Sequence, residues 1–134
     1  MSCQVRSLRA AEACAAKVLF RLARSKAASS LVGWGFAHVS WLLPVDKLYE
    51  SSQVLAFHHP RPSHRVHVLI VPKRAVRSFL HLDEDDAPLL GDIVAAAQHL
   101  VRELELDEAG YRLLVNGGHY QEVGQLHFHL VSDS

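Results

Sequence analysis

The chain has 134 residues, of which 49% are hydrophobic, so it is long enough for one folded domain with an apolar core but not for two. Its 14 basic and 14 acidic residues balance, which argues against the positive surface typical of a nucleic-acid-binding protein. Cys3 and Cys14 have no partner at zinc-ligand spacing, and we expect a cytoplasmic protein without disulfides.

The first 30 residues differ in charge from the rest of the chain. They contain six basic residues and one acid, Glu12, which gives them a net charge of +5 and leaves −5 on the remainder. Apolar residues recur at helical spacing through residues 5–28, and this pattern predicts a basic amphipathic helix. Such a helix either lies on an anionic membrane surface or packs on its own domain or on a second copy. We therefore divide the chain into an N-terminal extension, residues 1–30, and a domain, residues 31–134.

The sequence contains no convincing transmembrane helix. Its longest uncharged apolar stretch, residues 31–44, includes His38 and is shorter than the roughly 18–20 residues that cross a bilayer core. Any membrane contact is therefore expected to be peripheral, through the basic extension.

Short strands and turns follow in the middle of the chain. Residues 47–58 predict two strands around a Ser-Ser-Gln turn. A loop must come next, because Pro60 and Pro62 cannot donate hydrogen bonds to a sheet. The continuous apolar run of residues 66–71 then predicts a buried strand that Pro72 ends.

One main helix is predicted to start at Asp83. The acids of Asp83–Asp86 suit the cap and the positive end of a helix better than they suit a metal site. The predicted apolar face comprises Leu89, Leu90, Ile93, Val94, Ala97, Leu100, Val101 and Leu104. A strand over residues 111–116, a Gly-Gly loop and a closing strand over Gln125–Val131 complete an α+β fold, an antiparallel sheet with one main helix.

The closing strand, GQLHFHLV, alternates two kinds of side chain. Because neighbouring residues of a strand point to opposite faces, the apolar set faces the core: Leu126, Phe128 and Leu130. Gln125, His127 and His129 are then expected to lie together on the other face. Two imidazoles on a rigid strand can bind an anion and transfer protons near neutral pH.

The same spacing also permits a three-histidine metal site made of His127, His129 and His67. No carboxylate or further ligand is evident near His127, so we expect no metal and no other cofactor. The metal site is kept as a remote alternative.

The segment QEVGQLHFHLVS, residues 121–132, resembles the signature of the histidine triad (HIT) superfamily of nucleotide hydrolases and transferases, with Gln125 in place of the first histidine. Residues 55–82 resemble the family's upstream strands and its Val/Ile-Pro-Lys segment, and residues 111–118 resemble the strand that ends in the family's asparagine. The resemblance covers roughly residues 33–134 and is greatest to the histidine triad nucleotide-binding branch. It implies a HIT-like fold and a homodimer.

The resemblance also implies site residues and a reaction. His127 would attack the α-phosphorus of a purine nucleotide conjugate, such as a nucleoside phosphoramidate, and form a covalent nucleotidyl-histidine that water hydrolyses. His129 would contact the phosphate and the leaving group. Further positions match nucleotide-binding residues: His67, Asn116 and Gln121, with Phe36 and Val39 more loosely aligned to the base pocket.

Three positions depart from the family pattern. Gln125 cannot carry a charge as histidine can, His59 stands where the family has an acid that contacts the ribose, and Glu122 stands where relatives have a hydroxyl residue. We expect Gln125→His to keep or raise activity. The alternative that these departures favour is a nucleotide-binding or protein-interaction module without turnover.

Overall fold

The computed structural model describes residues 45–134. The predicted basic helix and the predicted base-pocket residues Phe36 and Val39 lie outside the described residues. The proposed boundary at residue 30 lies outside them too and stays a prediction.

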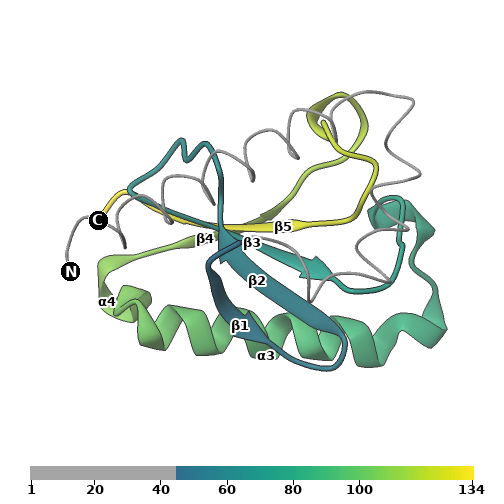
Figure 1. Cartoon of the computed structure of the whole chain (residues 1–134), viewed down its shortest axis with the longest axis horizontal. Coiled ribbons are helices and arrows are strands. Elements are labelled where there is room, and N and C mark those ends of the chain that lie inside the picture. The colour runs from purple at the N-terminus through teal and green to yellow at the C-terminus, as the bar shows by residue number, and fades with distance from the viewer. Residues whose placement is uncertain (1–44) are drawn as a thin grey trace, which may run out of the picture.

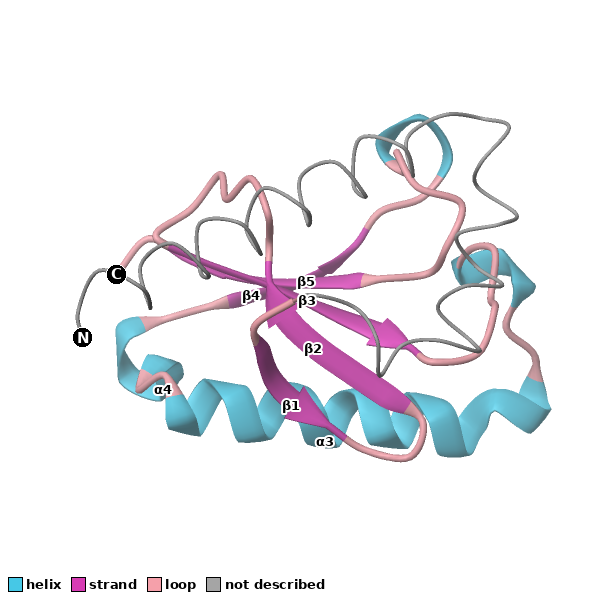
Figure 2. Cartoon of the chain, viewed as in Figure 1, coloured by secondary structure: helices cyan, strands magenta, loops and turns pink. Residues whose placement is uncertain are grey.

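The described residues form a five-stranded antiparallel sheet with one long helix on one face (Figure 1). The strands are β1 (Lys47–Glu50), β2 (Val54–His58), β3 (Val66–Pro72), β4 (Arg112–Val115) and β5 (Phe128–Ser132), and they lie in the order β1-β2-β3-β5-β4. The helices are α3 (Ala87–Glu103) and α4 (Leu106–Ala109), with 3-10 turns η2 (Phe79–His81), η3 (Glu84–Asp86) and η4 (Gly118–Tyr120) (Figure 2). The predicted α+β fold is confirmed.

The predicted turn between the first two strands is also confirmed. The Ser51 side chain accepts hydrogen bonds from the backbone N–H groups of Gln53, at 3.3 Å, and Val54, at 3.0 Å. Serine side chains commonly stabilise turns in this way. The turn starts the antiparallel pairing of β1 with β2.

The central strands β2 and β3 are buried on both faces. Their side chains alternate between two clusters. Val68 and Ile70 belong to the core between the sheet and α3, and Leu69 and Val71 belong to a smaller cluster on the opposite face of the sheet. This arrangement explains why residues 66–71 form a continuous apolar run rather than an alternating one. It also makes this pair a rigid base for the residues carried at its edges.

The capped start predicted at Asp83 exists, but it belongs to the 3-10 turn η3, and the main helix α3 itself begins at Ala87. The Asp83 side chain accepts the Asp85 N–H at 2.9 Å, and the Asp86 side chain accepts the Asp83 N–H at 3.0 Å. These reciprocal bonds form a capping box. Asp86 is buried and forms an ion pair with Arg74, which ties the helix start to the segment after β3.

The buried face of α3 differs from the predicted apolar face: Leu90 and Leu104 are only partly buried, Val94 is exposed, and Ala96 is buried in addition. The buried residues are Leu89, Ile93, Ala96, Ala97, Leu100 and Val101. Val94 was expected among them, but its side chain is 50% exposed, because one helical step turns it about 100° away from Ile93. Ala96 was not expected, and its small side chain lets the helix lie close to the sheet.

Across residues 45–134, no helix combines the length and hydropathy that spanning a membrane requires.

We expect Asp83→Ala to lower the free energy of unfolding by about 1 kcal/mol, because it removes the side-chain acceptor at the helix start. Urea unfolding followed by circular dichroism measures this change. Asp46→Ala, at an exposed position before β1, is the matched control and should change stability by less than about 0.5 kcal/mol. Equal effects of the two substitutions would show that the capping box does not stabilise the domain.

Candidate active site

The alternation predicted for the last strand holds for its apolar residues. Leu126, Phe128 and Leu130 all belong to the core beneath the sheet. His127 and His129 therefore point to the face opposite α3. His129 is paired with Leu69 of β3, and its ring lies 5.2 Å from that of His67, measured between centroids.

The structure differs from the prediction at Gln125. Regular strand structure begins at Phe128 rather than Gln125, and the Gln125 side chain is 2% exposed. Its amide bonds the backbone of Pro72, Arg74 and Val76 instead of lying beside the two imidazoles. The expectation of one polar face shared by all three side chains is therefore wrong for Gln125.

His127 is held in one tautomer by the backbone. Its Nδ1 lies 2.7 Å from the carbonyl oxygen of Gln125, so Nδ1 carries the proton and donates it to that oxygen. The other ring nitrogen, Nε2, then bears a lone pair. Burial lowers the pKa of His127, and this effect outweighs the raising effects of the hydrogen bond and of the nearby Glu122 carboxylate. A neutral imidazole with an unprotonated Nε2 is a competent nucleophile.

A chain of hydrogen bonds orients His129. The backbone N–H of Ser63 donates to Nδ1 of His67 at 3.2 Å, so His67 carries its proton on Nε2. That nitrogen lies 2.9 Å from Nδ1 of His129 and donates to it, which leaves the proton of His129 on Nε2. Nδ2 of Asn116 lies 3.3 Å from Nε2 of His129. Because both atoms are then donors, a hydrogen bond between these side chains requires the Asn116 amide to be turned over, with its oxygen toward the ring.

His59 joins this cluster from the proline-containing loop. Its ring stacks on that of His67 with the centroids 4.1 Å apart and an interplanar angle of 21°. The backbone N–H of Arg61 donates to Nδ1 of His59 at 3.0 Å. The backbone N–H of His59 donates to the backbone carbonyl of His67 at 2.8 Å. Sequence spacing predicted a loop here but not that it folds back onto β3.

The cluster is electrically neutral near pH 7. Burial, followed by the repulsion of neighbouring imidazoles, lowers the pKa values of His59, His67 and His129 to about 4. A bound anion would reverse part of this effect, since it favours the protonated form. The arrangement therefore suits a ligand that brings its own negative charge.

Three of these imidazoles could also approach a metal ion. His59, His67 and His129 each place a ligand atom within 4.8 Å of the others. This set differs from the predicted one, which had His127 in place of His59. Because the rings of His59 and His67 are nearly parallel and stacked, their in-plane lone pairs do not converge on one point. Metal binding by all three would therefore require rotation of a ring.

Of the remaining predicted residues, Asn116 contacts the cluster. It directly follows β4, and its side chain lies 3.3 Å from the ring of His129. Gln121 uses both amide hydrogens on backbone carbonyls, of Arg77 at 2.7 Å and Val123 at 2.8 Å, so only its oxygen can meet a ligand. His119 is exposed in η4.

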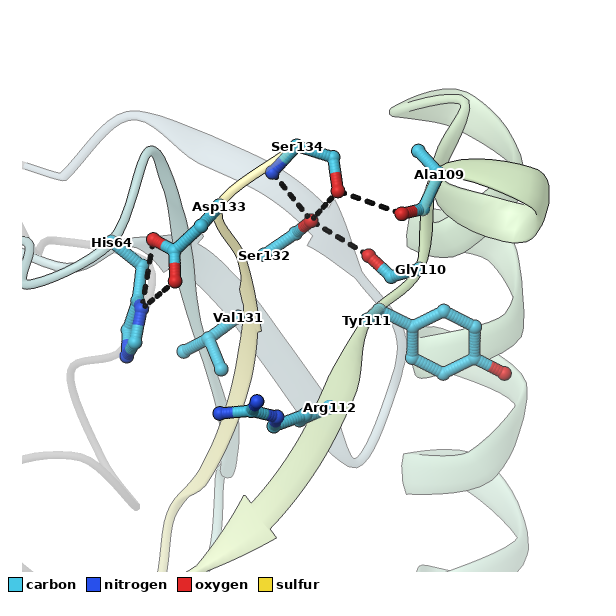
Figure 3. A pocket seen from close by; sticks show the side chains of 9 residues that line it. All are labelled: His64, Ala109, Gly110, Tyr111, Arg112, Val131, Ser132, Asp133 and Ser134. Atoms are coloured by element: carbon cyan, nitrogen blue, oxygen red, sulfur yellow. Dashed lines mark hydrogen bonds and ion pairs between the residues drawn. The ribbon is translucent and has the colours of Figure 1, made fainter.

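Outside the cluster, His58, His81 and His99 are exposed, and His64 is half-buried beside Asp133. Its ring bonds the Asp133 carboxylate at 2.9 Å on one side of a cavity of about 340 Å³ (Figure 3). The other lining residues come from the segments 109–112 and 131–134. Ser132 and Ser134 donate from their hydroxyls to the carbonyls of Gly110 and Ala109, which ties the last residues to the start of β4. None of the imidazoles of His59, His67, His127 and His129 lines this cavity.

Comparison with known proteins identifies the family of this chain. The sequence pattern of the HIT domain family matches residues 43–134. A HIT-like protein of Helicobacter pylori, itself uncharacterised, is 33% identical over 92 residues, which cover 67% of this chain and 86% of that protein.

Solved structures agree with the sequence comparison. A HIT family hydrolase from Legionella pneumophila superposes with a TM-score of 0.69 at 32% identity, covering 74% of this chain and 90% of that one. A histidine triad nucleotide-binding protein from Candida albicans superposes with a TM-score of 0.62 at 31% identity, covering 71% and 70%. The family pattern covers all of the sheet and the long helix, and solved members superpose on the same fold: this chain belongs to the HIT domain family.

Proposed function

We propose that this protein is a nucleotide hydrolase or nucleotidyl transferase that acts at the α-phosphate of a nucleotide conjugate, such as a purine nucleoside phosphoramidate. The observation that carries the proposal is the hydrogen bond from His127 Nδ1 to the Gln125 carbonyl, at 2.7 Å, because it leaves Nε2 as a lone-pair nucleophile. The similarity to a HIT family hydrolase supports a hydrolytic reaction.

In the proposed reaction, Nε2 of His127 attacks the α-phosphorus and the bond from phosphorus to the leaving amine breaks. The bound anionic conjugate favours the protonated form of His129, and this imidazolium gives a proton to the leaving nitrogen and becomes neutral. Water then attacks the phosphorus of the nucleotidyl-histidine, releases the nucleoside monophosphate and restores neutral His127. The proton that this water loses returns to His129.

We further propose that the chain belongs to the nucleotide-binding branch of the family and that Gln125 occupies the place of the first triad histidine. The similarity to the Candida albicans histidine triad nucleotide-binding protein supports the branch. Asn116, His67, His59 and the oxygen of Gln121 are the proposed ligand contacts among the described residues. Cytoplasmic location and contact of residues 1–30 with an anionic membrane stay predictions.

A module that binds nucleotides without turnover is the alternative. Glu122 is the observation in its favour, because its carboxylate lies close enough to influence the pKa of His127 and would repel a phosphate. The two functions differ in one measurable product, the covalent nucleotidyl adduct.

We expect His127→Ala to lower kcat on an adenosine phosphoramidate by at least about 1,000-fold, because the nucleophile is lost, while nucleotide affinity stays within about tenfold. Initial rates on a phosphoramidate panel and calorimetric titration with AMP measure the two effects. Intact mass spectrometry of the quenched wild-type protein should detect an adduct of one nucleotide. His99→Ala, on the surface of α3, is the matched control and should behave as wild type.

Two results would contradict this mechanism. One is turnover by His127→Ala at more than a few per cent of the wild-type rate. The other is a wild-type protein that binds AMP but hydrolyses no member of the panel, which would establish the binding module instead.

We expect kcat/KM to persist on the acidic side of pH 6.5, the ordinary pKa of histidine, because burial lowers the pKa of His127. The acid limb of the pH profile reports this group in the free enzyme. Rates measured between pH 4.5 and 8 should therefore stay level down to pH 6.5 and fall only on the acidic side of it. An acid limb at or above pH 6.5 would show that His127 is not held neutral by its surroundings.

The stability of the domain should depend on pH in the same window. His59, His67 and His129 have a pKa of about 4 in the folded state and 6.5 as the ordinary value, so the unfolded chain binds more protons between these pH values. Stability should consequently decrease as the pH falls from about 6.5 to about 4. Urea midpoints that stay constant across this window would contradict the assigned pKa values.

We also propose that the protein is a homodimer in which β4 of one copy pairs with β4 of the other. β4 is the last strand in the sheet order, and its Leu113 and Leu114 are 39% and 43% exposed. An apolar edge strand of this kind is a template for pairing with another chain.

Leu113→Lys is expected to convert this dimer to a monomer, because it places two like charges near the two-fold axis. Light scattering after size-exclusion chromatography measures the mass. Leu80→Lys, at an 89% exposed position in η2, is the control that should leave the mass unchanged. A monomeric wild-type protein would exclude the proposed dimer.

A further inference from the structure

The buried side chain of Gln125 uses every hydrogen-bonding group of its amide. Its oxygen accepts the backbone N–H of Val76 at 3.2 Å. Its nitrogen donates to the carbonyls of Pro72 at 3.2 Å and Arg74 at 2.9 Å. Because two of its partners are carbonyls and the third is an N–H group, only this orientation of the amide satisfies all three.

No other neutral side chain of similar size carries two N–H donors and one oxygen acceptor on the same terminal group. A histidine in its neutral form has one donor and one acceptor, so it would leave one of the two buried carbonyls without a partner. A glutamate would bring oxygen against both carbonyls. The donors and the acceptor of Gln125 thus match the backbone groups of residues 72–76. This match explains a glutamine at the position better than the loss of a histidine does.

Two neighbouring residues bond the segment 72–76: Gln125 through its side chain and Leu126 through its backbone. The next residue, Leu126, donates its N–H to the Val76 carbonyl at 2.7 Å. Between these two anchors lies the Gln125 carbonyl, which accepts the proton of His127 Nδ1. Movement of this segment would therefore displace the one acceptor that selects the tautomer of His127.

We propose that Gln125 is a positioning residue that holds its own carbonyl in line with His127 Nδ1, keeping the proton there and the lone pair on Nε2. The inference rests on the proposed function for its kinetic consequence, but the tautomer itself is independent of any activity. With a side chain only 2% exposed and fully bonded, Gln125 does not contact the ligand. It acts on the reaction only through His127.

The test uses Gln125→Met in the full chain, because methionine has a similar shape and no amide. Nitrogen-15 NMR of the imidazole groups should show His127 as the Nδ1–H tautomer in wild type and as a mixture in the variant. In kinetics, kcat should fall at least about tenfold with KM changed less than about threefold, as expected when a reacting group is misplaced. Assignment of the His127 signals comes from their loss in His127→Ala.

Two controls separate positioning from a general loss of stability. Gln53→Met makes the same substitution at a half-buried glutamine that bonds Asp92, and it should leave the His127 tautomer and kcat unchanged. Leu106→Ala removes core volume under α4, and it should lower the denaturation midpoint without changing the tautomer.

Gln125→His provides a second variant with a polar side chain. Against the expectation from the sequence, the hydrogen-bond count predicts that it lowers kcat and perturbs the tautomer, although less than Gln125→Met. Unchanged His127 signals and unchanged kcat in both variants would overturn the positioning role. If wild type hydrolyses no substrate, the proposed function fails, and the NMR comparison still decides the inference about Gln125.

Discussion

The structure of the site depends on the alternation of side chains along β5. Phe128 and Leu130 enter the core over α3, and this burial rotates His127 and His129 to the opposite face. A shift of one residue in pairing would expose two large apolar side chains and bury two imidazoles, so the register is strongly determined. The same hydrophobic burial that stabilises the domain thereby aims the candidate nucleophile.

Around that strand, the protein assembles imidazoles and keeps them neutral. His59, His67 and His129 lie in mutual contact, and burial together with mutual repulsion lowers their pKa values. Backbone groups rather than carboxylates determine where the protons reside: Ser63 N–H on one side, Gln125 C=O on the other. The carboxylate of Glu122 raises the pKa of His127 but does not hold its proton.

Two glutamines near the site bond the backbone with their amide hydrogens. Gln121 donates to the carbonyls of Arg77 and Val123, and Gln125 donates to those of Pro72 and Arg74. Burial removes Gln125 from the predicted polar face, whereas the oxygen of Gln121 stays a proposed ligand contact. Through these hydrogen bonds, the loop before β5 is bonded to the last residue of β3 and to the segment that follows it. Amide side chains are suited to this work because they satisfy donors and acceptors of buried backbone at once.

The sequence by itself determined the elements that rest on local patterns: the buried run of β3, the capped turn at Asp83 before the main helix, the turn at Ser51 and the alternation that separates Phe128 from His129. It also indicated the histidines that form the site. Only the tertiary structure decided that the loop carrying His59 folds onto His67 and that Gln125 is buried. These outcomes depend on contacts between residues far apart in the chain, such as Gln125 with Val76, and no periodicity or spacing within one segment encodes which distant backbone groups will need a partner.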